Sequence, residues 1–143
     1  MFAIVNNKGE IIEEFHEYNN IRELRDGERI LEAPFELPIG VLRDVARVYK
    51  GQIVPKMVVE ITLNKKIVRA DGEDEITVSV ELLDRQPDEI ISSVTLDIEG
   101  AKIPVQIEND KGSMVFSTTK KGVFTITADM ENVICLKRWF EAK

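Results

Sequence analysis

The fold is decided by the stretch Ile67-Val68-Arg69-Ala70-Asp71-Gly72-Glu73-Asp74-Glu75-Ile76-Thr77-Val78-Ser79-Val80-Glu81-Leu82-Leu83-Asp84. From residue 76 onward, every second position carries an aliphatic side chain, while the positions between them are mostly polar. This period of two in β-branched residues predicts a half-buried strand, because successive side chains of a strand leave on opposite faces. The Asp71-Gly72 pair before it predicts a sharp turn, since glycine readily adopts a positive φ.

Short apolar runs separated by turn residues continue to the C-terminus. We expect strands at residues 57–63, 76–83, 94–98, 103–107, 114–117, 123–128 and 133–140. Pro104 predicts an edge position or a bulge for its strand, because proline cannot donate a hydrogen bond to the ladder. Seven short strands without a long helix predict a mainly β domain built as an antiparallel β-sandwich.

The first 55 residues predict a small α+β module built on a β-hairpin. Residues 2–5 and 10–15 are apolar runs separated by Asn6-Asn7-Lys8-Gly9, which is typical of a hairpin turn, and residues 30–33 predict a third strand. Residues 38–50 allow either an amphipathic helix that begins at Pro38 or two short strands at 42–45 and 47–49. The junction predicted at 51–56 gives a first domain over 1–55 and a second over 56–143.

Composition and charge narrow the classes of partner. Of 143 residues, 43% are apolar and 31% are charged, as in a folded globular protein. The net charge of −7 disfavours nucleic acid or an anionic membrane as the main partner. The start of the chain lacks a secretory signal pattern, and no apolar run approaches the roughly 20 residues that cross a bilayer, so we expect synthesis in the cytoplasm without membrane insertion.

No motif in the sequence indicates catalysis, a cofactor or a metal centre. His16 is the only histidine, and Cys135, the only cysteine, has apolar neighbours that predict a buried thiol rather than a reactive one. The carboxylates of Asp71, Glu73, Asp74 and Glu75 are suitable calcium ligands, but their spacing does not match a helix–loop–helix calcium loop and solvated acids are commoner on a turn. We therefore expect a protein that is not an enzyme, and leave open whether this turn binds an ion.

Two groups of residues are candidates for surface contacts. In the strand predicted at 133–140, alternation places Leu136 and Phe140 on one face and Trp139 on the other, so both faces are apolar. Its second face would be covered either by the N-terminal module or by another subunit, and with Tyr49 these residues are the interface candidates. The cluster of Ser117, Thr118, Lys120 and Lys121 at a strand end is either an ordinary turn or a polar contact surface.

A series of turn motifs runs through residues 57–143. Ala70-Asp71-Gly72 precedes the strand at 76–83; Asn109-Asp110-Lys111-Gly112 and Phe116-Ser117-Thr118-Thr119-Lys120-Lys121-Gly122-Val123-Phe124-Thr125-Ile126-Thr127-Ala128 follow. The series resembles the bacterial immunoglobulin-like domain of the invasin/intimin type, which implies an immunoglobulin-like antiparallel β-sandwich. That family usually has Asp-x-x-Gly-Asn-Pro after the second strand, whereas this chain has Asp84-Arg85-Gln86-Pro87-Asp88-Glu89, so we expect a loop of different shape.

A second resemblance covers residues 1–55. Phe2-Ala3-Ile4-Val5-Asn6-Asn7-Lys8-Gly9-Glu10-Ile11-Ile12-Glu13, followed later by Tyr49-Lys50-Gly51-Gln52-Ile53-Val54-Pro55, is similar to a small module near the ends of bacteriophage tail and tail-fibre-associated proteins. In this chain Lys50 replaces the acidic or amide residue that is usual there.

Together the two resemblances imply a non-enzymatic structural or adhesion protein of a bacteriophage virion, a tail or capsid accessory component. The N-terminal module would dock on the particle and the immunoglobulin-like domain would project from it. Expected partners are other particle proteins or a second copy in a homo-oligomer, with host-surface carbohydrate as a further contact. The alternative is a bacterial protein-binding or carbohydrate-binding module of the same fold.

Overall fold

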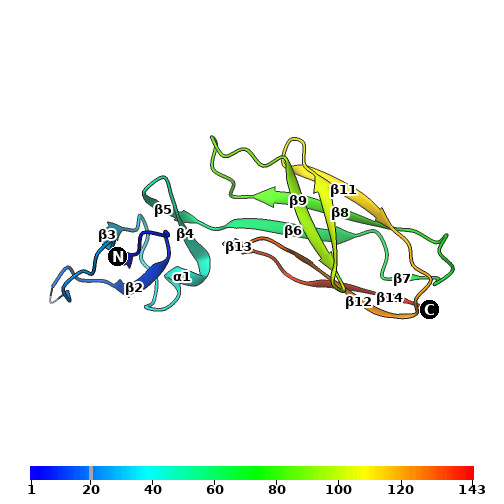
Figure 1. Ribbon diagram of the computed structural model, residues 1–143, viewed down its shortest axis with the longest axis horizontal. Coiled ribbons are helices and arrows are strands. Elements are labelled where there is room, and N and C mark those ends of the chain that lie inside the picture. The colour runs from blue at the N-terminus through cyan, green and yellow to red at the C-terminus, as the bar shows by residue number, and fades with distance from the viewer. Residues whose placement is uncertain (20) are drawn as a thin grey trace. The chain divides into compact units, whose positions relative to one another are not determined.

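The computed structural model describes residues 1–19 and 21–143, and the chain divides into two compact units, Met1–Lys56 and Met57–Lys143. Both units are mainly β, and the described residues contain one short α-helix, α1 (Figure 1). Each unit buries its own cluster of apolar side chains, so each has a separate hydrophobic core.

The first unit contains a three-stranded sheet in the order β2-β1-β3 and a two-stranded sheet of β4 and β5. The predicted hairpin is confirmed, because β1 and β2 pair antiparallel with Phe2 opposite Phe15. The strand predicted at 30–33 is also present, as β3, and it lies antiparallel to β1 on its other side. The elements are β1 (Phe2–Val5), β2 (Ile11–Phe15), β3 (Arg29–Glu32), α1 (Leu42–Val45), β4 (Ala46–Tyr49) and β5 (Gln52–Pro55).

Residues 38–50 combine parts of the two predicted interpretations: the strand predicted at 47–49 is present as β4, whereas residues 42–45 form a short helix instead of a strand. The helix α1 covers only Leu42–Val45, and β4 begins directly after it at Ala46. Gly40 precedes the helix with a φ of +93°, which is outside the helical region. β4 forms an antiparallel hairpin with β5, so the ladder with residues 52–55 outweighs the helical periodicity that the apolar positions suggested.

The second unit is built from two sheets that share one core. The four-stranded sheet has the order β11-β8-β6-β13, and the five-stranded sheet has the order β10-β9-β12-β14-β7 (Figure 1). The inward faces of both sheets contribute to a single apolar cluster, which makes the unit a β-sandwich. The strands are β6 (Met57–Leu63), β7 (Ile67–Val68), β8 (Ile76–Leu83), β9 (Ser93–Ile98), β10 (Ala101–Gln106), β11 (Lys111–Phe116), β12 (Gly122–Ala128), β13 (Val133–Ile134) and β14 (Arg138–Ala142).

The alternation in residues 76–83 is confirmed. Ile76, Val78, Val80 and Leu82 are buried, whereas the residues between them are half-buried. The strand that contains Pro104, β10, lies at the edge of the five-stranded sheet, as the missing donor predicts. Gly72 has a φ of +75°, the conformation expected of the glycine in the Asp-Gly turn.

The single strand predicted at 133–140 is wrong. β13 joins the four-stranded sheet beside β6, and β14 joins the five-stranded sheet beside β12. Residues 135–137 therefore cross from one sheet to the other. β13 is parallel to β6 and β14 is parallel to β7, so the sandwich is not wholly antiparallel. Residues 133–136 are all apolar, and for that reason no break is visible in the pattern where the crossing begins.

Candidate interaction surface

The crossing at 135–137 leaves one edge of the four-stranded sheet open. β13 pairs only with Met57 and Val58, although β6 continues to Leu63. Within the part of the chain that the structure describes, no strand pairs with β6 on this side beyond Val58. Such an open edge presents backbone hydrogen-bonding groups to other chains.

The register shows which backbone groups face the open side. The N–H of Asn64 donates to the Thr77 carbonyl oxygen in the ladder between β6 and β8. Because facing groups alternate along an antiparallel ladder, Ile61 and Leu63 direct their N–H and C=O groups away from β8. The Nε atom of Arg138, at the start of β14, donates to the Ile61 carbonyl oxygen at 2.9 Å.

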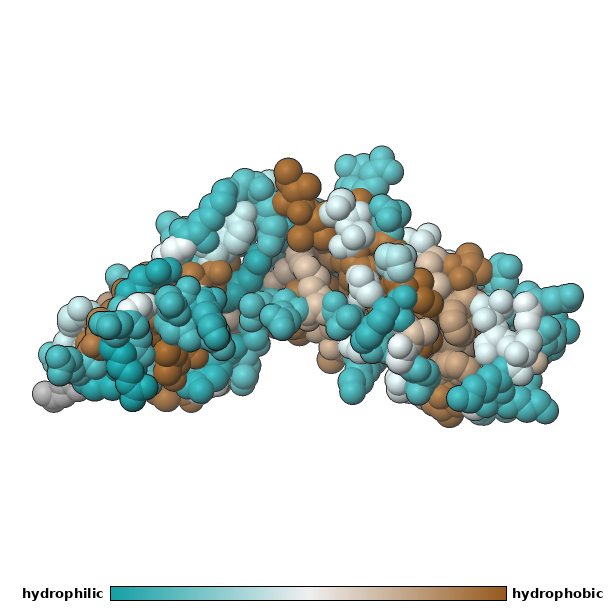
Figure 2. All heavy atoms as spheres, viewed as in Figure 1, coloured by the Kyte–Doolittle hydropathy of each residue, from teal (hydrophilic) through white to brown (hydrophobic). Residues whose placement is uncertain are grey.

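Two shallow pockets lie along this edge and meet at Ile61 and Arg138. One, of about 260 Å³, also contacts Leu63 and Trp139, and the other, of about 130 Å³, also contacts Leu136. We call the two together the β6–β14 groove. Its two large apolar side chains on the crossing and on β14 are exposed, Leu136 by 67% and Trp139 by 51%. Figure 2 shows the molecular surface as a mixture of apolar and polar areas.

The groove is locally basic in a chain with a net charge of −7. Lys66, Lys137 and Arg138 line it, and Glu60 is the acidic residue of its lining. The ammonium of Lys66 lies 5.1 Å from the centroid of the Trp139 ring, a cation–π contact that positions both side chains. The groove thus combines an open backbone edge, exposed apolar side chains and positive charge.

The four interface candidates from the sequence lie in different environments. Leu136 and Trp139 border the groove, but Phe140 is fully buried and does not reach the surface. Its ring stacks on Phe124 at 5.2 Å and meets Phe116 edge-on at 5.9 Å, in the core between the sheets. Tyr49 belongs to β4 of the first unit, where the guanidinium of Arg47 lies over its ring.

The predicted polar cluster at residues 117–121 forms the connection between β11 and β12. The hydroxyl of Thr118 accepts a hydrogen bond from the Lys120 N–H, and its carbonyl oxygen accepts one from the Gly72 N–H. The cluster is therefore bonded to the Asp-Gly turn. Ser117, Lys120 and Lys121 are exposed there, and their role as a contact surface stays a prediction.

The acidic turn at 71–75 uses its carboxylates internally. Asp71 accepts hydrogen bonds from the N–H groups of Asp74 and Glu73, which lower the pKa of its carboxyl. The ammonium of Lys65 and the Arg69 N–H bond to Asp74, and in that order they lower its pKa. The described side chains include no group of three or more His, Cys, Asp or Glu residues placed to hold a metal ion.

The other two candidate reactive side chains, His16 and Cys135, each contact neighbouring parts of the fold. The Nε2 of His16 lies 2.6 Å from the Leu37 carbonyl oxygen, to which it donates. Cys135 is half-buried against the core, rather than fully buried as predicted.

A concavity of about 500 Å³ on the outer face of the four-stranded sheet is lined by carboxylates, hydroxyls and Lys111, without an aromatic ring. Of the helices described, none is long and apolar enough to span a membrane.

Two charged clusters in the first unit were not predicted from the sequence. The carboxylate of Glu14 is buried, and it accepts hydrogen bonds from the N–H groups of Gly40 and Leu42 at 3.0 and 2.9 Å and from the Arg43 guanidinium. Burial by itself would raise the pKa of Glu14, but these hydrogen bonds outweigh it and lower the pKa. Glu14 thereby replaces a local capping residue at the start of α1.

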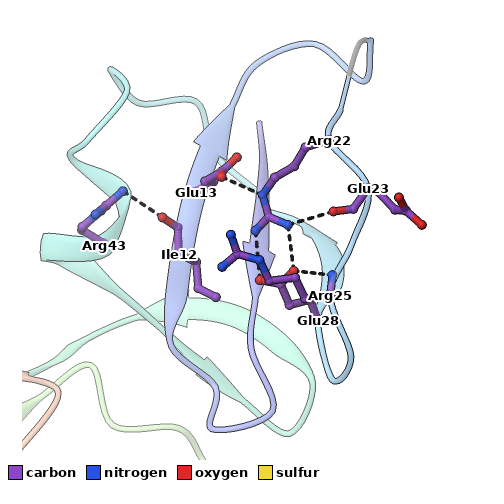
Figure 3. Close-up of polar contacts among 7 residues, drawn as sticks. All are labelled: Ile12, Glu13, Arg22, Glu23, Arg25, Glu28 and Arg43. Atoms are coloured by element: carbon purple, nitrogen blue, oxygen red, sulfur yellow. Dashed lines mark hydrogen bonds and ion pairs between the residues drawn. The ribbon is translucent and has the colours of Figure 1, made fainter.

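The second cluster is centred on Arg22 (Figure 3). Its guanidinium makes two hydrogen bonds to Glu28, at 2.8 and 2.9 Å, and one to Glu13 at 2.8 Å. The bonds from Arg22, and then the one from the Arg25 N–H, lower the pKa of Glu28 to about 2. This cluster ties the segment between β2 and β3 to the sheet, which is a structural role.

The residues of the groove that sequence reasoning missed are Lys66, Lys137, Arg138 and the edge of β6. One signal was present: Arg138 is two residues before Phe140, so alternation places its charged side chain on the same face of the strand as a large apolar ring. Comparison with protein-family models finds none that matches the chain, and comparison with curated proteins finds no match either.

Proposed function

We propose that this chain is a non-enzymatic structural protein of a bacteriophage-type particle, and that its second unit is an immunoglobulin-like domain that binds another protein through the β6–β14 groove. The observation that carries the proposal is the open edge of β6, flanked by the exposed Leu136 and Trp139. Large apolar side chains beside unpaired backbone groups favour contact with a second polypeptide.

The strand order supports an immunoglobulin-like fold for the second unit. In immunoglobulin domains the first, second and fifth strands share one sheet, and the third, sixth and seventh share the other. When the short β7 and β13 are set aside, β6, β8 and β11 form one sheet, and β9, β12 and β14 are in the other. The fourth strand, β10, lies beside β9 in the second sheet, whereas in constant-type domains the fourth strand belongs to the first sheet. The sheet membership of the other six strands supports the resemblance of the turn motifs to the invasin/intimin type.

The placement in a particle rests on the resemblance of residues 1–55 to bacteriophage tail modules. The hairpin of β1 and β2 and the hairpin of β4 and β5 both occur in the first unit. We assign docking on the particle to this unit and association with the virion to the whole chain. A homo-oligomer is the second form of assembly that this proposal includes.

Photo-crosslinking in the producing cells tests the proposal. A photoreactive amino acid at position 136 should form a covalent adduct with a particle protein or with a second copy, and mass spectrometry identifies which. The matched control carries the same amino acid at Val115, which is exposed on β11 away from the groove. Adducts from position 115 and none from position 136 would contradict the proposal.

Carbohydrate binding is the second candidate, and the Trp139 ring beside polar side chains favours it. Exposed aromatic rings beside polar groups suit sugar rings, and Thr62, Lys66 and Lys137 line the same pocket. However, the ammonium of Lys66 occupies one face of the ring. A glycan array probed with the wild type and with Trp139→Ala distinguishes the candidates, because only the carbohydrate function predicts glycan binding that the substitution abolishes.

A further inference from the structure

We infer that the partner of the β6–β14 groove is an extended, acidic segment of another protein, which adds to β6 as a further strand. This inference rests on the proposed protein-binding function and names the chemistry of the partner. It follows from three properties of the groove: the spacing of its open backbone groups, its charge, and the position of Arg138.

The backbone groups favour an extended peptide over a helix. Ile61 and Leu63 present N–H and C=O groups on one side of a strand, two residues apart, which is the spacing that a neighbouring strand matches. A helix satisfies its own backbone groups and leaves those of the edge unpaired. From Val58 to Leu63 the groove follows six residues of β6, which corresponds to roughly 20 Å of extended chain.

The charge of the groove selects an acidic segment. Lys66, Lys137 and Arg138 line the two pockets, with Glu60 as the acidic residue among their lining side chains. The whole chain carries −7, so this local excess of positive charge attracts an acidic peptide although the protein as a whole would repel it. Exposed Leu136 provides the apolar contact for the alternate side chains of the incoming strand.

Arg138 has a role in the free and in the bound protein. In the free protein its guanidinium donates a hydrogen bond to the Ile61 carbonyl oxygen. This bond protects the open edge from non-specific pairing with other strands. In the complex, a backbone N–H of the incoming strand donates to this oxygen. The guanidinium is then available to bind a carboxylate of the partner, an interaction stronger than a hydrogen bond between neutral groups.

Peptide binding to the full-length protein, followed by fluorescence anisotropy, tests the inference. The probe is a labelled peptide of about eight residues in which valine and glutamate alternate, close to the length of a typical strand. A second probe carries lysine in place of glutamate, and a third is the acidic peptide with N-methyl groups on alternate amides, which removes the donors along one edge. We expect binding of the first probe only, with an affinity that falls as salt rises.

Two pairs of variants locate the site. Lys137→Glu should weaken binding of the acidic peptide about tenfold, equivalent to about 1.4 kcal/mol, whereas Lys8→Glu, with the same change of charge on the first unit, should not. Leu136→Ser should also weaken binding, and Val115→Ser should not, since both native side chains are exposed but only Leu136 lines the groove. Amide NMR shifts on peptide addition should be centred on Ile61 and Leu63.

The inference is overturned if the acidic peptide does not bind at millimolar concentration, or if the basic or N-methylated peptide binds equally well. Shifts centred on the edge strands β10 or β11 would overturn it too. A dimer that Leu136→Ser dissociates would assign the groove to a second copy instead. If position 136 crosslinks to a particle protein while the acidic peptide fails to bind, the proposed function stands and strand addition does not.

Discussion

The Nε atom of Arg138 donates a hydrogen bond to the Ile61 carbonyl oxygen at 2.9 Å, between residues 77 apart in the sequence. This bond links β14 of the five-stranded sheet to β6 of the four-stranded sheet on the open side of the sandwich. The guanidinium is half-buried and supplies a donor at a place where the backbone ladder of β6 has ended.

Replacing Arg138 should therefore affect both stability and self-association. Arg138→Met removes the donor, and we expect a loss of about 1–2 kcal/mol in the free energy of unfolding. It also leaves the edge unprotected, so sedimentation should show more association than in the wild type. Arg69→Met is the control, because the Arg69 side chain is 78% exposed and its Nε atom lies 3.7 and 3.8 Å from the carboxylates of Asp71 and Asp74. Equal results for the two variants would contradict this role.

Phe140 and Trp139 are adjacent in sequence but should differ greatly in their effect on stability. Phe140→Ala removes a fully buried ring that contacts Phe116 and Phe124, and we expect a loss of about 3–5 kcal/mol. Trp139→Ala removes an exposed ring with a cation–π contact worth about 0.5–1 kcal/mol. Urea unfolding of both variants measures the difference. Similar losses would show that the last strand does not have one buried and one exposed face.

Gly112 is required for space rather than for backbone conformation. A Cβ atom at this position would overlap the Gln106 carbonyl oxygen and press on the side chains of Val105 and Ile107, from the end of β10 and the residue after it. Gly112→Ala should cost about 1–3 kcal/mol of stability, as overpacked substitutions do. Ser113→Ala, at the next and exposed position, is the control and should have little effect in the same thermal unfolding experiment.

The buried carboxylate of Glu14 should hold α1 in place. Glu14→Gln replaces the acceptor of several N–H groups with a neutral amide, and we expect a loss of about 1–3 kcal/mol. Amide hydrogen exchange measured by NMR should then be faster at Gly40 and Leu42. The control is Glu17→Gln, at an exposed position close by in the sequence. Unchanged exchange at both amides would rule out the capping role.

Glu28 should make the stability of the first unit depend on pH in the acidic range. Its pKa falls from an ordinary 4.5 to about 2 in the folded protein, chiefly through Arg22. Because the unfolded chain binds this proton more tightly, the contribution of Glu28 is complete above about pH 4.5. It is lost as the pH falls from about 4.5 through about 2.

Carboxyl titration by NMR checks this prediction. Arg22→Gln should return the pKa of Glu28 toward 4.5, since it removes the two hydrogen bonds from the guanidinium. Arg25→Gln should shift it less, because Arg25 donates its backbone N–H, which the variant retains. A low Glu28 pKa that persists in Arg22→Gln would mean that Arg22 is not its cause.

The amino-acid sequence by itself determined where most strands lie. The strands at 57–63 and 76–83 were predicted with the bounds that the structure has, and the edge position of Pro104 and the first hairpin were correct as well. These features are local. A period of two reflects which face of a strand is buried, and proline or an Asp-Gly pair restricts the backbone at its own position.

Tertiary structure alone decided the features on which the groove depends. The break at 135–137, the burial of Phe140 and the hydrogen bond from Arg138 to Ile61 all arise because the last segment pairs with one sheet and then with the other. The same holds for Glu14, which bonds to groups 26 to 29 residues away. Apolar runs look alike whichever sheet they join, so the partner of a strand is set by how the whole chain packs.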